Sequence, residues 1–251
     1  MNFSFSKCDD WKSLPLYKKI HHYKKQLTKD YAVFVDKIIA KKIVKYVCKE
    51  AISITPIIRI LSSPDDITES DLNDNHIIKA AHGCGWNIDI GPDTTVDGVK
   101  TLLNKWNCVY SPHEEETQYK FIRPRFFIEE KIDDIIVGKT GQAGVFMVRC
   151  IHGEPITIGV KYGNRQNSYD ISWNLINTTS PEIQLIIEKP KNLDKMLHLS
   201  RKLSAVFEFV RMDFYIDVND DIYFSEYTFT PAGGYQLFTD EQEQEFGLLW
   251  Q

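Results

Sequence analysis

The stretch Val210–Ile216 and the residues that follow it restrict the fold of this chain more than any other feature. Apolar and polar residues alternate there, so one face of a β-strand carries Arg211, Asp213 and Tyr215. Residues 217–221 are rich in Asp and Asn, which favours a turn, and Ile222–Glu226 reads as a second strand. The segment therefore predicts an antiparallel β-hairpin.

Two acidic side chains approach each other in this hairpin. A turn about Asn219 and Asp220 places Asp213 opposite Ser225 or Glu226, and opposed residues lie ~5 Å apart and diagonal ones ~7 to 8 Å apart. Such a pair requires solvation, a raised pKa or a cation between the two groups. Mg²⁺ suits the last case, because it binds through one or two carboxylates together with water and phosphate oxygens. The alternative is a solvent-facing hairpin with incidental acids.

A second candidate site lies at a lysine followed by glycines. The strand His76–Ala80 carries Lys79, and His82–Asn87 contains two glycines that alternate with larger residues. Glycine permits positive φ and lets backbone N–H groups approach phosphate oxygens closely. Neither a Walker loop nor a Rossmann fingerprint is present, so an ordinary β-turn is the competing interpretation.

The charge distribution is uneven. The net charge of −5 argues against a general nucleic-acid-binding protein, but residues 7–50 carry a net charge of +7 and the rest of the chain −12. Between Val35 and Ala51 apolar residues follow helical spacing and lysines fall mostly on the other side. We favour a solvated helix face for these lysines, with an anion-binding role as the alternative.

Nothing in the sequence indicates a membrane or an oxidising compartment. No apolar stretch approaches the ~20 residues that span a bilayer, and the first residues turn acidic before a signal peptide develops. The five cysteines are scattered and form no Cys-x-x-Cys pair. We expect a cytoplasmic protein with reduced thiols.

The pattern of elements predicts the α+β class. A loop rich in Ser, Pro and Asp, Ser62–Asn75, suggests a helical N-terminal segment over 1–75 and a second domain over 76–251. Helices are expected to begin after Thr94 or Thr95 and near Asn192. The expected strands are Ile57–Leu61, His76–Ala80, Arg125–Glu129, Val145–Ile151, Ile156–Lys161, Phe209–Ile216 and Ile222–Glu226.

An ordered series of short motifs resembles the ATP-grasp superfamily, closest to the TupA-like group that is linked with teichuronopeptide synthesis. The series covers about Asp36 to Tyr235. It comprises Asp36-Lys37, Ile78-Lys79, His82–Asn87, Asn104-Lys105-Trp106, Gln118-Tyr119-Lys120, Phe127–Glu130, Gly153-Glu154, Trp173-Asn174, Lys189–Asn192, Val210–Asp213 and Glu226–Pro231. The resemblance implies an ATP-grasp fold, in which two α+β subdomains hold ATP between antiparallel sheets. A nucleotide-binding lobe is expected at about 76–130 and a metal-binding, catalytic lobe at about 140–240.

The resemblance also implies roles for individual residues. Lys79 and Arg211 are the expected catalytic cations, Lys79 at the ATP phosphates and Arg211 at the transferred phosphoryl group. Mg²⁺ is expected at Asp213, Glu226 and Thr228. The other expected nucleotide-binding residues are the loop residues His82, Gly83, Cys84, Gly85, Trp86 and Asn87 and the hinge residues Ile128, Glu129 and Glu130.

One stretch departs from the family pattern. Where the family has approximately Asp-Tyr-Lys, this chain has Val145-Phe146-Met147, with Lys139 or Arg149 as possible substitutes. The main hypothesis is an ATP- and Mg²⁺-dependent ligase that joins a small-molecule or glycan-linked carboxylate to an amine through an acyl-phosphate. Tyr162, Arg165, Tyr169, Trp173 and Asn174 are candidates for binding these substrates, although packing is the more usual role of Tyr169 and Trp173. The alternatives are a catalytically degenerate nucleotide-binding protein of a polysaccharide pathway and an ATP-grasp phosphotransferase.

Overall fold

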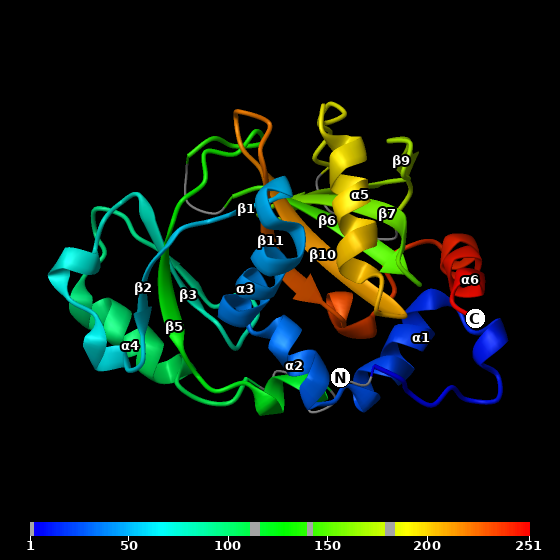
Figure 1. Ribbon diagram of the computed structural model, residues 1–251, viewed down its shortest axis with the longest axis horizontal. Coiled ribbons are helices and arrows are strands. Elements are labelled where there is room, and N and C mark those ends of the chain that lie inside the picture. The colour runs from blue at the N-terminus through cyan, green and yellow to red at the C-terminus, as the bar shows by residue number, and fades with distance from the viewer. Residues whose placement is uncertain (1–2, 111–115, 140–142, 179–183) are drawn as a thin grey trace.

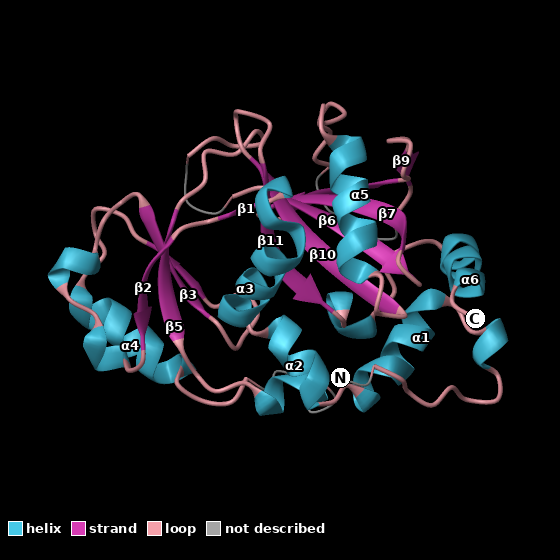
Figure 2. Cartoon of the chain, in the orientation of Figure 1, coloured by secondary structure: helices cyan, strands magenta, loops and turns pink. Residues whose placement is uncertain are grey.

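The computed structural model describes residues 3–110, 116–139, 143–178 and 184–251. Two β-sheets lie next to each other along the longest axis of the molecule, and helices cover their outer faces (Figures 1 and 2). One sheet has seven strands and the other has four. One mixed and one antiparallel sheet with separate helices form an α+β arrangement, so the fold class predicted from the sequence is confirmed.

The helices and strands of the described residues have the following bounds. The helices are α1 (Leu16–Tyr23), α2 (Lys29–Val35), α3 (Lys37–Cys48), α4 (Val96–Trp106), α5 (Leu193–Ser204) and α6 (Asp240–Leu249). The strands are β1 (Ser53–Ile54), β2 (Ile57–Leu61), β3 (His76–Ala80), β4 (Asn87–Asp89), β5 (Phe126–Glu130), β6 (Val145–Ile151), β7 (Glu154–Tyr162), β8 (Arg165–Tyr169), β9 (Leu175–Ile176), β10 (Phe209–Ile216) and β11 (Ile222–Thr228).

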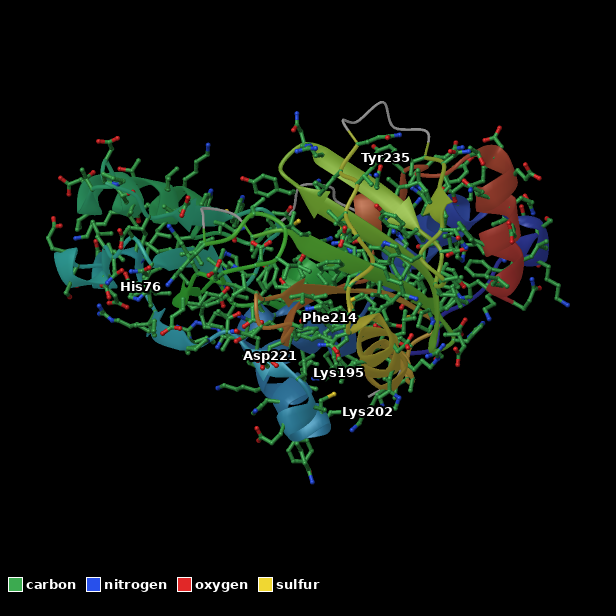
Figure 3. All side chains as sticks on the ribbon, turned by 90° about the horizontal axis from the view of Figure 1, so that it is seen from above. His76, Lys195, Lys202, Phe214, Asp221 and Tyr235 are labelled. Atoms are coloured by element: carbon green, nitrogen blue, oxygen red, sulfur yellow. The ribbon has the colours of Figure 1, made fainter. Side chains whose placement is uncertain are left out.

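The larger sheet has the strand order β1-β11-β10-β6-β7-β8-β9, and only β1 runs parallel to its neighbour. Helices α3 and α5 lie on the same side of it; Lys195 and Lys202 mark α5 in Figure 3. Met212 and Phe214 are fully buried and share one core with Met196 of α5. Because side chains alternate along β10, the residues between them face the other side of the sheet.

The smaller sheet has the order β2-β5-β3-β4, with all neighbours antiparallel. Helix α4 covers it, and Val99 and Leu103 of this helix pack against Ile78 and Phe126. The helix begins where the sequence predicts, since the Thr95 side chain caps it by accepting a hydrogen bond from the Gly98 N–H at 3.2 Å.

The boundary expected near residue 75 does not coincide with the sheets. Residues 57–61 form β2, which pairs with β5 of the smaller sheet. The N-terminal helices instead complete the core of the larger sheet: Trp11 and Tyr23 pack against Trp250, and Trp250 stacks on Phe209 of β10. The apolar sides of these helices are buried in this core.

The expectation of a solvated lysine face on residues 35–51 is wrong for Lys37 and Lys41. The Lys41 side chain is only 4% exposed, whereas Lys42, Lys45 and Lys49 are exposed. Helix α3 contacts β11 of the larger sheet, while the N–H of Lys37 donates to the Ala81 carbonyl, next to the smaller sheet, at 3.1 Å. A helix held between two sheets buries part of its polar side as well as its apolar side.

No helix among the described residues is long and apolar enough to cross a membrane.

The two ends of the chain are joined by a close contact between α1 and α6. Lys19 is fully buried, and its ammonium donates to the carbonyls of Gly247 and Trp250 at 2.7 Å each, which caps the C-terminal end of α6. A Cβ on Gly247 would lie 2.4 Å from the Leu14 carbonyl oxygen and 3.0 Å from the Pro15 Cα. The close contact between α1 and α6 therefore requires a residue without a side chain at position 247.

We expect Gly247→Ala to destabilise the protein by about 1 to 3 kcal/mol, because α6 must move away from the backbone of residues 14–16. Gly91→Ala is the matched control, since a Cβ there meets no atom within 4 Å and its φ is not positive. Urea unfolding at equilibrium measures both effects. Equal stability of the two variants would contradict this account of the contact.

Candidate active site

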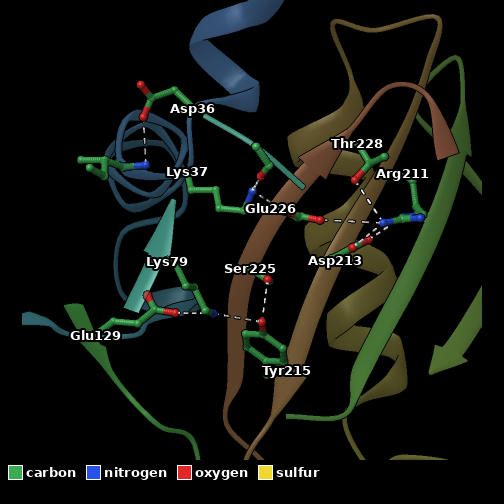
Figure 4. A network of polar contacts seen from close by, with 12 residues as sticks. Asp36, Lys37, Lys79, Glu129, Arg211, Asp213, Tyr215, Ser225, Glu226 and Thr228 are labelled. Carbon is green, nitrogen blue, oxygen red and sulfur yellow. Dashed lines mark hydrogen bonds and ion pairs between the residues drawn. The ribbon is translucent and has the colours of Figure 1, made fainter. Parts of the chain in front are cut away.

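A cavity of about 380 Å³ lies between the two sheets. Its walls come from α3, from β3 and the turn after it, from β5 and the residues after it, and from β6, β7, β10 and β11. Charged side chains and apolar side chains both line it. Figure 4 shows the polar contacts on the side formed by α3, β3, β5, β10 and β11.

The hairpin predicted for residues 210–226 is present, and a β-bulge sets the register of its two acids. Phe214 pairs with Phe224, but Asp213 pairs with Glu226 rather than with Ser225. Without the extra residue, Ser225 would oppose Asp213. The bulge aims both Ser225 and Glu226 at the cavity, where the Ser225 hydroxyl lies 3.0 Å from the Tyr215 hydroxyl.

Arg211 neutralises the two acids from within the hairpin. Its guanidinium donates to both oxygens of Asp213, at 2.7 and 2.6 Å, and lies 3.9 Å from a Glu226 oxygen. The same guanidinium donates to the Thr228 hydroxyl at 3.1 Å. Thr228 lies beside the pair without lining the cavity, as far as the described residues show.

The two carboxyl groups are electrostatically different. Burial, reinforced by the charge of Glu226, raises the pKa of Asp213 to about 6 despite the opposing effect of Arg211. Burial acts on Glu226 in the same direction, but Lys37 and Arg211 outweigh it and lower the pKa of this carboxyl group. Glu226 therefore provides the more persistent negative charge.

A second ion cluster lies on the opposite wall. Glu129 of β5 is 1% exposed and lies between two lysines: Lys79 at 2.5 Å and Lys41. Burial alone would raise the pKa of Glu129, but the two ammonium groups outweigh it and lower the pKa. Lys79 also donates to the Tyr215 hydroxyl at 3.4 Å, so it connects the smaller sheet to β10 of the larger one.

Helix α3 supplies a further cation, Lys37. The carboxylate of Asp36 accepts the N–H groups of Ile38 and Ile39 at 3.0 and 3.1 Å, which fixes the start of the helix. From the first turn, the Lys37 ammonium reaches Glu226 at 3.1 Å and the Gly83 carbonyl (Figure 4). One lysine thus links the turn after β3 to the β10–β11 hairpin.

The predicted phosphate loop is the turn between β3 and β4, and its residues divide into two groups. Cys84, Gly85 and Asn87 line the cavity, and Gly85 has a φ of +70°, which favours glycine. His82 is fully buried: its Nε2 donates to the Trp106 carbonyl at 2.9 Å and its Nδ1 accepts the Arg125 N–H at 3.2 Å.

Trp86 and Gly83 stabilise this turn through packing contacts. The Trp86 ring stacks on Trp106 with centroids 5.7 Å apart and meets Tyr110 edge-on. A Cβ on Gly83 would lie 2.8 Å from the Trp86 ring. Like His82, neither residue is among the described residues that line the cavity. The sequence pattern did not distinguish the residues that shape the turn from those that face the cavity.

The predicted hinge is β5 and the residues after it. Phe127, Glu129 and Glu130 line the cavity, whereas Ile128 is fully buried in the core of the smaller sheet under α4. Beyond β5, Lys131 and Ile132 continue the lining. The side chain of Ile128 is thus part of the core.

The stretch that departs from the family pattern contributes apolar side chains to the cavity. Val145 and Met147 line it, and Phe146 faces the core. Neither Lys139 nor Arg149 lines it among the described residues: Lys139 is exposed, and Arg149 is buried beneath Phe238, 5.3 Å from the ring. Burial and the charge of Arg211 lower the pKa of Arg149 to about 10.

The five residues that the sequence analysis suggested for substrate binding lie outside the cavity lining of the described residues. Tyr169 and Trp173 stack at 4.2 Å and pack on the core, as the packing alternative predicted, while Asn174 donates to Asp170 and Arg165 to the Gln184 carbonyl. Tyr162 is half-buried at the edge of the same core. The cavity lining of the described residues contains none of the five.

The sequence analysis missed Lys37 and Lys41 as site residues. A signal was available: the two lysines are four residues apart, so they share one side of a helix that begins directly after Asp36. Tyr215 was placed on the correct face of β10, but its contact with Lys79 depends on how the two sheets approach each other.

We expect Glu129→Gln to destabilise the protein by about 3 kcal/mol, because Lys41 and Lys79 remain buried without their shared counter-charge. Glu50→Gln is the control, since Glu50 pairs with Lys45 at the surface and is 94% exposed, where such pairs contribute little. Urea unfolding at neutral pH measures both variants.

The same variant makes a pH-dependent prediction. The pKa of Glu129 is lowered below its usual 4.5, so its stabilising effect is present above that pH and is lost as the pH falls through the folded-state pKa. The difference in stability between the wild type and Glu129→Gln should therefore narrow on acidification below about pH 4.5. A constant difference would refute the assignment of Glu129 as the charged partner of both lysines.

Comparisons with known proteins agree with the resemblance identified in the sequence. A family model described as TupA-like ATPgrasp matches residues 18–249. Among solved structures, D-alanine–D-alanine ligase from Bacillus anthracis matches with a TM-score of 0.51 at 12% identity, over 95% of this chain and 74% of that chain. At this identity the likeness shows the fold, which is the ATP-grasp fold.

Two further solved structures are more distant. Biotin carboxylase from Campylobacter jejuni matches with a TM-score of 0.47 at 16% identity, over 85% of this chain and 43% of that chain. The ATP-grasp ligase PsnB, complexed with a minimal precursor, matches with a TM-score of 0.43 at 9% identity, over 82% of this chain and 55% of that chain.

The first three solved structures that match are longer proteins, of which the chain spans 50% to 64%. No curated protein matches the chain. The family model, however, covers nearly its whole length. The chain is a member of the TupA-like ATP-grasp family.

Proposed function

We propose that this protein is an ATP- and Mg²⁺-dependent ligase that joins a carboxylate to an amine. The observation that supports this most strongly is the pairing of Asp213 with Glu226 beside Arg211, on the wall of a cavity whose opposite wall carries Lys79. Family membership supplies the prior for ATP, and the charges of the cavity provide the chemistry that ATP requires.

The donor set fits a magnesium ion. No cluster of three or more His, Cys, Asp or Glu suited to a metal occurs among the described residues. A metal at Asp213 and Glu226 would take its other ligands from phosphate and water, as Mg²⁺ commonly does. When bound, it would neutralise phosphate charge. Thr228 is the third proposed ligand, and its hydroxyl is held by Arg211.

An apolar slot in the same cavity suits a nucleotide base. Ile77, Phe127 and Ile132 contribute from the side of the smaller sheet, and Val145 and Met147 from the larger one. We assign adenine to this slot, with backbone groups near Glu129 and Glu130 as its hydrogen-bonding partners. The phosphates then extend toward Lys79 and the turn residues Cys84, Gly85 and Asn87.

The side chains of the chain would act mainly by alignment and by charge. Arg211, held by Asp213, presents its guanidinium where a carboxylate and the transferred phosphoryl group meet. In this reaction the carboxylate would attack the terminal phosphate and release ADP, and the amine would then displace inorganic phosphate from the acyl-phosphate and lose a proton to give the amide. Small-molecule or glycan-linked substrates and a role in surface-glycan synthesis are proposed by analogy with the family name alone.

A nucleotide-binding protein without catalysis is the second candidate. It is favoured by Val145 and Met147, which place apolar side chains on the cavity wall where an acid and a lysine were expected. ADP formation with mixtures of amino acids and other carboxylates separates the candidates: Mg·ATP binding without substrate-dependent ADP supports the accessory role. A phosphorylated product without an amide identifies a phosphotransferase.

We expect Asp213→Asn and Glu226→Gln each to lower substrate-dependent ADP formation by about 10²- to 10³-fold, because each removes a metal-binding charge. Glu241→Gln, an exposed acid on α6, is the matched control and should leave turnover unchanged. Circular dichroism and unfolding curves verify that the variants fold. Unchanged turnover in either site variant would contradict the assignment of that residue as a metal ligand.

A further inference from the structure

Lys161 differs from every other cation in the cavity. Six basic residues line it among the described residues: Lys37, Lys41, Lys79, Lys131, Lys161 and Arg211. Five of them have a carboxylate partner: Glu226 for Lys37, Glu129 for Lys41 and Lys79, Asp89 for Lys131, and Asp213 for Arg211. Within the described part of the chain, Lys161 is the one cavity cation with no ion pair.

The position of Lys161 on β7 follows from the register of this strand with β6. It pairs with Val145 of β6, so its side chain shares the cavity face with Val145 and, diagonally, with Met147. The residue opposite Met147 is Gly159, and the Met147 methyl group covers this glycine, 2.9 Å from where a Cβ would be. Nothing bulky on β7 therefore separates Lys161 from the middle of the sheet face.

The cavity lining as a whole carries more basic than acidic residues. It contains four acids, Glu129, Glu130, Asp213 and Glu226, against the six basic residues among the described residues. An ammonium group that is half-buried in such a cavity lacks part of its hydration and has no counter-charge from the protein. An anionic ligand supplies both a hydrogen-bond acceptor and that charge.

We propose that Lys161 binds the phosphate chain of the nucleotide. This inference rests on the proposed function, because it takes the base to lie in the slot over Val145 and Met147 and the terminal phosphate to lie near Asp213 and Glu226. A phosphate chain between these places passes over the cavity face of β6, and the diagonal distance of ~7 to 8 Å from Met147 is within reach of a lysine side chain on β7. Lys161 would then set affinity for phosphates without affecting recognition of the base.

The test compares ligands that differ in phosphate number. Isothermal titration calorimetry measures the Kd of adenosine, ADP and ATP with Mg²⁺ for the wild type and for Lys161→Met, which keeps an unbranched side chain without the charge. We expect the variant to bind ADP and ATP about tenfold more weakly, the usual effect of losing one hydrogen bond to a charged group. Adenosine should bind to both proteins within about twofold, since it offers no phosphate oxygen.

Two further variants test the same inference: one moves the positive charge to a neighbouring strand, and the other is a matched control. In the double variant Met147→Lys/Lys161→Met the ammonium moves to the diagonal position on β6, and we expect ATP affinity to return to within about threefold of the wild type. Lys139→Met removes an exposed lysine outside the cavity and should bind ATP as the wild type does. Acetylation of Lys161, followed by peptide mass spectrometry, should slow at least about fivefold in the presence of inorganic tripolyphosphate, because a bound anion shields the amine.

Unchanged ATP affinity in Lys161→Met overturns this inference and leaves the ligase proposal standing. Equal weakening of adenosine and ATP also overturns it, since the lysine would then support the fold of the cavity. An effect confined to the KM of a carboxylate substrate assigns Lys161 to that substrate instead and overturns it as well. Failure of the wild type to bind any nucleotide overturns both proposals.

Discussion

The site depends on the need of buried carboxylates for nearby positive charge. Glu129 and Asp213 are almost inaccessible to water, and cations within hydrogen-bonding distance of each favour its charged form against the effect of burial. The cations reach these acids from different parts of the fold: Arg211 from the same strand, and Lys41 and Lys79 from α3 and β3. Charge compensation thereby connects the two sheets and α3 in one network of contacts that extends from one wall of the cavity to the other.

Helix α3 shows why the sequence could not reveal this network. Its apolar spacing predicts a surface helix, and a surface helix exposes its lysines. Only the approach of two sheets to the same helix turns Lys37 and Lys41 inward, and that approach involves residues nearly 190 positions apart, such as Lys37 and Glu226. Local periodicity contains no information about such a contact.

The hairpin was predictable because its information is local. Alternation along 210–216 gave the faces of β10, and the turn residues gave the partner strand. The one uncertainty, Ser225 or Glu226 opposite Asp213, came from a bulge that simple alternation does not encode. His82 and Trp86 lie outside the cavity lining of the described residues for a different reason: glycine-rich turns need buried supporting residues, and a sequence motif does not separate these from residues that face the cavity.

The apolar residues Val145 and Met147 have a consequence for how such a cavity can vary. On a sheet face, diagonal positions on neighbouring strands are ~7 to 8 Å apart, so the ends of long side chains from the two positions can reach the same point. A charge can therefore move from one strand to the next without moving the point at which its ammonium acts. The acids of the proposed metal site lack this freedom, because a carboxylate is short and both would have to converge on one ion. We infer that the pairing of Asp213 with Glu226 is the rigid element of this cavity, and that the cations around it can be supplied from several strands.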